Sequence, residues 1–193
     1  MAIHQPDLFD AAAPGLPGFT AAPDLVSPAE ERALIAMIDA SGLAPFRFQG
    51  WLGKRLTRSF GWSYDFDAGR LAEAEPIPGE LLAVRERAAA FAGLEPDALV
   101  QTLLIRYDPG AGIGWHRDRP QFEHVVGISL GAPATMRFRR RRREGGFDRV
   151  SIPLAPRSIY HLAQEARHVW EHSIAPIEAT RWSITFRSLA QRA

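Results

Sequence analysis

The stretch Arg181-Trp182-Ser183-Ile184-Thr185-Phe186-Arg187 alternates polar and apolar side chains along its whole length. Successive side chains of a β-strand point to opposite faces, so this pattern predicts a strand with one polar and one apolar face. In an ordinary surface strand the polar face meets solvent. In a barrel whose outer surface packs on helices, the polar face can line the mouth instead. The pattern alone leaves both arrangements open.

Seven further strands are predicted upstream, because from about Leu99 short runs rich in β-branched and aromatic residues alternate with turns. The clearest turn signals are Asp108-Pro109-Gly110 and Glu144-Gly145-Gly146. The predicted strands span residues 100–107, 115–118, 124–130, 135–140, 147–154, 158–162, 169–174 and, last, 181–188.

Two helices are predicted before these strands. The first begins at Ser27-Pro28-Ala29-Glu30, where Ser is the cap, Pro lies in the first turn and Glu follows three residues after the cap; Gly42 ends it. The second runs from about Pro78 to Ala92. Helices followed by about eight short strands indicate an α+β, mainly β fold, an antiparallel barrel or sandwich with the N-terminal helices packed on its outer face.

Length and composition limit the remaining possibilities. The 193 residues fit one domain, which we place at residues 27–193, after a flexible Ala-, Pro- and Gly-rich arm at residues 1–26. The chain has no cysteine, which excludes disulfides and thiolate metal sites. Because it shows neither a membrane-spanning apolar run nor a secretory signal, we expect a cytoplasmic protein with no membrane partner. We also expect a monomer. The net charge of +1 does not by itself indicate a nucleic-acid partner.

His116 and Asp118 lie two residues apart, so in an extended segment both point to the same face. With one later histidine they offer two imidazoles and a carboxylate, a set that binds one face of Fe(II) and leaves the other positions open. A His-x-Asp triplet is also common as a solvated surface pair. His124, His161 and His168 compete with His172 for the third place, and spacing alone excludes neither His161 nor His168.

The polar face of residues 181–187 also suits a co-substrate. Six residues of strand span roughly 20 Å, and two arginines leaning toward each other leave room for a short dicarboxylate. Guanidinium groups pair well with carboxylate oxygens, and Tyr107 could add a hydroxyl.

These residues together resemble the AlkB family of iron(II)- and 2-oxoglutarate-dependent dioxygenases, over a core of about residues 99–190. The motifs follow one another in the family's order: Arg106-Tyr107-x-Pro109-Gly110, His116-x-Asp118, Ser129-Leu130-Gly131, Glu171-His172-Ser173 and Arg181-x-Ser183-x-Thr185-Phe186-Arg187. The resemblance implies a double-stranded β-helix, or jelly roll. It also favours His172 as the third ligand.

What the resemblance implies for the site is specific. Fe(II) would be held by His116, Asp118 and His172, which are the catalytic residues. Arg181 would pair with the distal carboxylate of 2-oxoglutarate with help from Tyr107, and Arg187 would lie near its keto-acid end; Ser129 and Ser183 complete the predicted co-substrate site. With O₂, 2-oxoglutarate would be converted to succinate and CO₂, and an N-methyl group on a substrate would be hydroxylated and lost as formaldehyde.

The resemblance implies that the substrate is an alkylated base of DNA or RNA, single-stranded or flipped from a duplex. A substrate lid at about residues 43–70 interleaves aromatic and cationic residues, and ordinary core packing of such residues is the competing interpretation. We predict substrate contacts at Arg58, Phe60, Trp62, Tyr64 and Trp115. The hairpin tip Arg139–Arg143 suits phosphates or is simply solvated.

Three positions depart from the pattern of the repair demethylases. Ile105 stands where an Asn is usual, Ser183 replaces another common Asn, and Pro120 stands where an acidic residue helps to read the damaged base. Pro120 therefore motivates an alternative, a hydroxylase or demethylase of a protein side chain or small molecule. A non-catalytic nucleic-acid binding module is a third hypothesis, which the retention of all three ligands and both arginines argues against.

Overall fold

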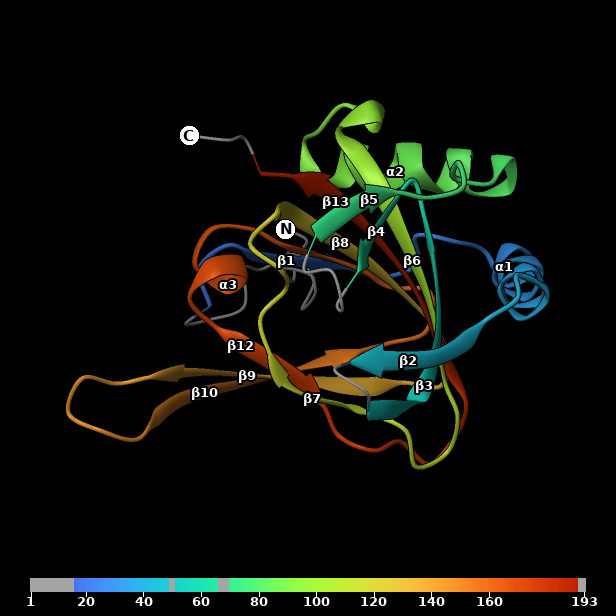
Figure 1. Ribbon diagram of the computed structural model, residues 1–193. Coiled ribbons are helices and arrows are strands. Elements are labelled where there is room, and N and C mark those ends of the chain that lie inside the picture. Colours follow the sequence, from blue (N-terminus) through green and yellow to red (C-terminus); the bar gives the residue numbers. More distant parts are fainter. Residues whose placement is uncertain (1–15, 49–50, 66–69, 191–193) are drawn as a thin grey trace, which may run out of the picture.

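The computed structural model describes residues 16–48, 51–65 and 70–190. Strands dominate, and α1 and α2 lie outside the sheets (Figure 1). In chain order the elements are β1 Phe19–Ala22, α1 Pro28–Ala40, β2 Ala44–Phe48, β3 Trp51–Phe60, β4 Trp62–Asp65, β5 Arg70–Glu73, a 3₁₀ turn Gly79–Leu81, α2 Leu82–Ala92, a 3₁₀ turn Pro96–Ala98, β6 Leu99–Tyr107, β7 Ile113–His116, β8 Phe122–Gly131, β9 Ala134–Arg141, β10 Phe147–Leu154, β11 Ile159–Leu162, α3 Gln164–His168, β12 Glu171–Ile174 and β13 Arg181–Leu189.

Two antiparallel sheets form the jelly roll that the family resemblance implies. The seven-stranded sheet has the order β1-β11-β8-β13-β6-β3-β2, and the four-stranded sheet has the order β10-β9-β12-β7. Strands β4 and β5 make a separate pair. A cluster of buried side chains from both sheets, including Val125, Phe138 and Leu162, lies between them. The order of strands is not the order of the chain, so the fold depends on pairings between distant segments.

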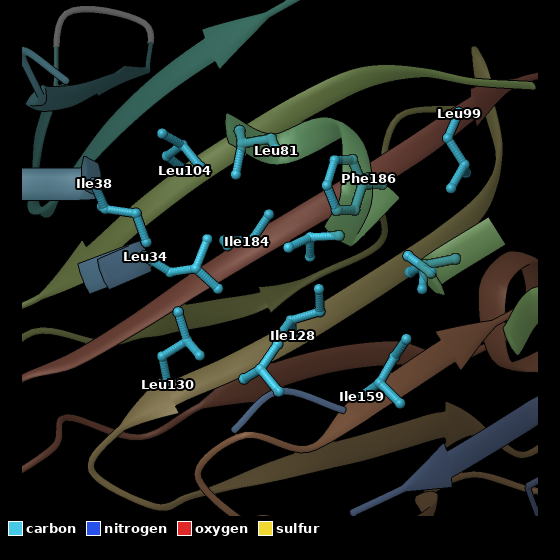
Figure 2. Close-up of a cluster of buried hydrophobic side chains, with 14 of the residues drawn as sticks. Leu34, Ile38, Leu81, Leu99, Leu104, Ile128, Leu130, Ile159, Ile184 and Phe186 are labelled. Carbon is cyan, nitrogen blue, oxygen red and sulfur yellow. The ribbon is translucent and has the colours of Figure 1, made fainter. Parts of the chain in front are cut away.

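Strand β13 lies in the middle of the larger sheet, between β8 and β6. Its apolar residues Ile184 and Phe186 are fully buried under α1 and α2, in the cluster drawn in Figure 2. Leu34 and Ile38 of α1 and Leu81 beside α2 complete that layer. The polar residues of β13 therefore face the other sheet, as in the barrel arrangement considered from the sequence.

The first helix begins as predicted. The Ser27 side chain accepts a hydrogen bond from the Glu30 backbone N–H, and the Glu30 carboxylate accepts one from the Ser27 N–H, which makes a complete capping box. The second helix begins later than predicted, at Leu82, because residues 79–81 form a 3₁₀ turn. It ends at Gly93, whose φ of 68° is left-handed.

Two predictions are wrong. A flexible arm was predicted at residues 1–26, but from Leu16 onward the chain is packed, since Leu16 and Phe19 are buried and β1 pairs with β11. Residues 1–15 lie outside the described residues. The predicted strand 169–174 is a strand only from Glu171, because Val169 caps the short helix α3. No helix in the described part of the chain is long and apolar enough to cross a membrane.

Candidate functional site

The two halves of the metal constellation meet where β7 pairs with β12. His116 is the last residue of β7, and it lies directly opposite His172 of β12, with ring centroids 4.3 Å apart. Asp118 follows two residues later and brings Oδ2 to 3.6 Å from the Nε2 of His172. One ligand atom from each residue lies within 4.8 Å of the other two. The three side chains thus converge as a metal site requires.

Hydrogen bonds engage the atoms of this trio that point away from the metal position and leave its ligand atoms available to a cation. The Nδ1 of His116 lies 2.9 Å from the Gly114 carbonyl oxygen, and as a donor to it leaves the Nε2 lone pair for a cation. The Oδ1 of Asp118 accepts a hydrogen bond from Nε of Arg187 at 3.0 Å and forms an ion pair with Nη2 at 2.7 Å, which leaves Oδ2 available. Two imidazole nitrogens and one carboxylate oxygen, with no thiolate, suit Fe(II).

The charge states also fit a ferrous ion. Burial, with a contribution from nearby His116, lowers the pKa of His172 to about 3, and burial lowers the pKa of His116 as well. Both rings are therefore neutral near pH 7, as a ligand must be. Burial is the largest single influence on Asp118 and would raise its pKa. The charges of Arg187, both histidines and Arg167 together outweigh burial and hold that pKa well below its usual range.

The three competing histidines lie in other contacts. The Nδ1 of His124 and the Nε2 of His161 are 2.9 Å apart and bond to each other, and His168 pairs with Glu123 at 2.9 Å. Within the described residues no second group of three metal-ligating side chains converges in this way. The geometry therefore places His172, and none of the other three, beside His116 and Asp118.

A cavity of about 1260 Å³ opens between the two sheets at this trio. Four polar residues of β13 line it: Arg181, Ser183, Thr185 and Arg187. From β6, Leu103, Ile105 and Tyr107 add a mainly apolar wall. The cavity is large enough for a small co-substrate together with part of a second ligand.

Arg181 is the least ordinary residue in the cavity. It is only 1% exposed, yet neither terminal nitrogen has a hydrogen-bond partner in the described part of the chain. Its Nε donates to the Ser129 hydroxyl at 3.2 Å, and the guanidinium lies 5.3 Å from the Tyr107 ring centroid. A buried guanidinium with two orphaned nitrogens is costly unless an anion completes it, and a carboxylate fits the pair.

Arg187 differs from Arg181 because its partners are already present. Besides binding Asp118, its Nη1 donates to the Gln101 side-chain oxygen at 2.9 Å. The guanidinium is thus held between β6 and the Asp118 carboxylate, at the metal trio. These contacts engage three of its donors and hold the guanidinium against the Asp118 carboxylate. Its predicted place near the keto-acid end of 2-oxoglutarate stays a prediction.

Three more cavity residues were not predicted as site residues, although one of them, Arg55, lies within the predicted lid. Arg55 on β3 lines the cavity, stacks 3.9 Å above the Phe46 ring and forms no ion pair with a described carboxylate; burial lowers its pKa. Arg167 is 3% exposed, and Nη2 donates to the carbonyl oxygens of Arg119 and Phe122. Burial raises the pKa of Tyr160 to about 12, so its hydroxyl stays neutral. Of these residues, only Arg55 could have been predicted from the sequence, by its alternate position along the strand.

The predicted substrate residues of the lid mostly face away from the cavity. On β3 the cavity side carries Arg55, Thr57 and Ser59, so Arg58 and Phe60 have the opposite parity. Phe60 is 6% exposed in the helix-covered core, and Arg58 pairs with Glu75 at 2.7 Å. Neither residue therefore lines the cavity, because the polar and aromatic residues of β3 are spread over both faces.

The other predicted substrate residues have mixed outcomes. Trp62 does not line the cavity, and the side chain of Tyr64 lies outside the described residues. Trp115 borders the cavity, but its ring lies under Arg137 and Arg139, on the opposite face of β7 from His116. Ile105, Ser183 and Pro120, where the family pattern is broken, all line the cavity.

Comparison with known proteins agrees with this geometry. The profile of the 2OG-Fe(II) oxygenase superfamily matches residues 18–187. The chain belongs to this superfamily. As an oxygenase of this kind it is a 2-oxoglutarate-dependent dioxygenase in class, with Fe(II) as its metal and O₂ as its second co-substrate. The trio and the orphaned Arg181 supply side chains of the right chemistry for both the ion and the keto acid.

Its similar proteins place this oxygenase among AlkB-like members. It is 30% identical over 168 residues to the tRNA (carboxymethyluridine(34)-5-O)-methyltransferase alkbh8 of Xenopus tropicalis, covering 83% of this chain and 25% of that protein. It is 31% identical over 116 residues to the alpha-ketoglutarate-dependent dioxygenase AlkB of Salmonella typhimurium, covering 54% and 51%. The chain therefore spans a quarter to a half of these relatives.

Two more comparisons extend over nearly the whole chain. The uncharacterized protein L905 of Acanthamoeba polyphaga mimivirus is 27% identical over 196 residues, covering 92% of this chain and 87% of that protein. The solved structure of OsALKBH1 superposes with a TM-score of 0.66 and 15% identity, covering 89% of this chain and 97% of the other. The second match shows the shared jelly-roll fold.

Proposed function

We propose that this oxygenase removes alkyl groups oxidatively from alkylated bases of nucleic acid. The observation that carries the oxygenase chemistry is the convergence of His116, Asp118 and His172 beside the buried, uncompensated guanidinium of Arg181. The nucleic-acid substrate is supported by relatives whose names refer to tRNA and to alkylated DNA.

In this proposal the side chains have separate tasks. His116, Asp118 and His172 would hold Fe(II), and Arg187 keeps the Asp118 carboxylate ionised and oriented through a hydrogen bond and an ion pair. Arg181 binds the distal carboxylate of 2-oxoglutarate with both terminal nitrogens, while Ser129 and Tyr107 fix the guanidinium. Ser183 stands across from Ser129 on the next strand, and Ser183 lines the cavity.

The bound metal supplies the activation of O₂ that the reaction needs. In the net reaction 2-oxoglutarate loses CO₂ to give succinate, which receives one oxygen atom of O₂, and the other oxygen atom becomes a hydroxyl on the alkyl carbon. An N-hydroxymethyl group then releases formaldehyde and leaves N–H. The apolar wall of Leu103, Ile105 and Val125 limits water around the reacting groups.

A second substrate class is favoured by one observation. Pro120 lines the cavity and offers neither charge nor a hydrogen-bond donor where a base-reading acid would stand. A methylated protein side chain or small molecule would need no such group. This alternative keeps every role of the trio and of Arg181.

The test has two stages. With Fe(II), ascorbate and 2-oxoglutarate, the protein should form succinate, and His116→Ala should abolish this while unfolding at a similar temperature without metal. Formaldehyde release should then be measured from N-methylated single-stranded DNA, RNA and a methylated peptide panel. Release from oligonucleotides supports the proposal, release only from peptides supports the alternative, and no succinate in the first stage refutes both.

A further inference from the structure

The β9–β10 hairpin concentrates the positive charge of this chain. Residues 134–154 contain seven arginines and two acids, a formal charge of +5, whereas the whole chain carries +1. The remaining residues therefore carry a net charge of −4. Figure 1 shows this hairpin extending beyond the body of the fold. Balanced surfaces intersperse both signs, so this separation of charge needs an explanation.

The acidic neighbours neutralise only part of this charge. Arg139 pairs with Glu171 at 2.6 Å, Arg140 with Asp148 and Glu165 at 3.1 Å, and Arg142 with Asp148 at 3.1 Å. The other four arginines have no acidic partner among the described residues: Arg137, Arg141, Arg143 and Arg149. Arg141, Arg143 and Arg149 are exposed. The hairpin thus carries unpaired cations accessible to an anionic partner.

Most of these cations share one face of the smaller sheet. The register places Arg139 between Arg149 and Glu171, and Arg137 between Ser151 and Ser173. This face is the reverse of the one that carries Phe138 and His172. We call it the arginine face and define it by Arg137, Arg139, Arg141 and Arg149 with the rings of Trp115 and Phe147.

Aromatic rings hold the guanidinium groups of this face in place. Arg137 and Arg139 lie 5.3 and 4.5 Å from the Trp115 centroid, and Arg139 and Arg149 lie 4.7 and 5.4 Å from the Phe147 centroid. Stacking restricts long side chains while their N–H groups stay free to bond. Arginines on alternate positions of β9 are spaced at roughly 7 Å, which makes a regular row of cations.

The arginine face is continuous with the cavity. Trp115 and Glu171 belong to this face, both border the cavity, and each is the chain neighbour of a metal-site histidine. A polyanion lying on the row would pass the edge strand β7, where one of its units could enter the cavity. Because the rings are covered by guanidinium groups, the face offers charge and no open platform for stacking bases.

We propose that the arginine face and the hairpin tip bind the phosphate backbone of the nucleic acid whose base enters the cavity. This inference rests on the proposed function and names the part of the surface that holds the polymer. Recognition is by phosphate charge and is independent of base sequence. Among phosphate-bearing polymers we favour a single strand, since a flexible backbone can follow the row and turn into the cavity at β7.

The test compares two variants with equal changes of charge. One replaces Arg141, Arg143 and Arg149 with Gln; the control replaces Arg32, Arg85 and Arg87 with Gln, on the helices that cover the other sheet. Affinity for an unmethylated single-stranded oligonucleotide is measured across a series of salt concentrations, and urea unfolding confirms that both variants fold. Each phosphate of a single strand that the protein no longer neutralises lowers the log–log salt slope by about 0.7.

For the hairpin variant we expect the slope to fall by about 2, and the affinity at 0.1 M salt to fall roughly 100-fold; the control should bind like the parent. An unchanged slope in the hairpin variant, or an equal loss of affinity in the control, would overturn the inference. If the hairpin variant lost affinity for anionic lipid vesicles but kept its affinity for the oligonucleotide, the inference would also be overturned, in favour of a membrane surface. If the parent still releases formaldehyde from methylated oligonucleotides in these cases, the proposed function survives and only the surface is refuted.

Discussion

Replacing Arg181 with Met should separate co-substrate binding from folding. The native guanidinium is 1% exposed with two unpartnered nitrogens, so removing it relieves a cost of about 1–3 kcal/mol. The same change loses the Ser129 hydrogen bond, worth about 1 kcal/mol, and the contact with the Tyr107 ring, worth up to about 2 kcal/mol. These changes nearly cancel, and the free energy of unfolding without ligand should change by no more than about 2 kcal/mol.

Binding of 2-oxoglutarate should respond very differently. Truncating one partner of a buried, hydrogen-bonded charge pair costs about 2–5 kcal/mol, which corresponds to a Kd at least roughly 30-fold higher. At a concentration 100 times its Kd, a ligand stabilises the parent by about 2.7 kcal/mol; the variant at that concentration should gain less than about 0.9 kcal/mol.

The assay is urea unfolding of the Mn(II)-loaded protein with and without 2-oxoglutarate. Arg106→Met is the matched control, because Arg106 lies outside the cavity and pairs with Asp39 and Asp108 at 3.1 and 2.8 Å. It should keep the full stabilisation by 2-oxoglutarate. The reasoning fails if Arg181→Met retains that stabilisation, or if it loses more than about 4 kcal/mol without any ligand, since Arg181 would then be a structural residue.

Three further predictions address the surroundings of the site. Arg187→Met should weaken Co(II) binding about 10–100-fold by calorimetry, and more at pH 6 than at pH 7.5, because the pKa of Asp118 rises; an unchanged Kd would contradict this. Gly127→Ala should destabilise by about 1–3 kcal/mol in urea, because its Cβ would lie 2.1 Å from the Tyr160 ring, whereas Gly79→Ala meets nothing within 4 Å. Burial lowers the pKa of His161 to about 4, so as the pH falls the unfolded chain is protonated at this histidine before the folded chain is. The free energy of unfolding therefore falls between about pH 6.5 and 4. In that range His161→Gln should reduce the pH dependence of urea unfolding by up to about 1.4 kcal/mol per pH unit.

Local sequence patterns predicted the parts of the fold that depend on residues close together in the chain. The alternation of residues 181–187 predicted which side chains of β13 share a face, and the capping residues Ser27 and Glu30 predicted where α1 begins. The bounds of the core strands were predicted to within a few residues. The prediction for residues 169–174 did not foresee the short helix α3 that precedes the strand. These signals depend on residues a few positions apart, which is what a sequence displays directly.

The failures come from contacts between distant segments. Strand β1 has only four residues, in an Ala-rich stretch, and exists because β11 pairs with it. The cavity side of β3 depends on its pairing with β6, which turns Arg55 inward and Arg58 toward Glu75. For the third ligand, spacing left His161 and His168 open beside His172. The family resemblance favoured His172, which the pairing of β12 with β7 brings to His116.

The site and the hydrophobic core share one register, which explains how a cavity lined by charges can be rigid. Strand β13 pairs on both sides, with Arg181 opposite Tyr107 and Gly131, and its alternate residues Ile184 and Phe186 are fully buried under the helices. A slip of one residue would bury two arginines in the apolar layer and turn those apolar residues into the cavity. Core burial therefore fixes Arg181 and Arg187 in place before any ligand arrives. The charged side chains need no reorganisation on binding, and the energy released by a carboxylate at Arg181 goes into affinity.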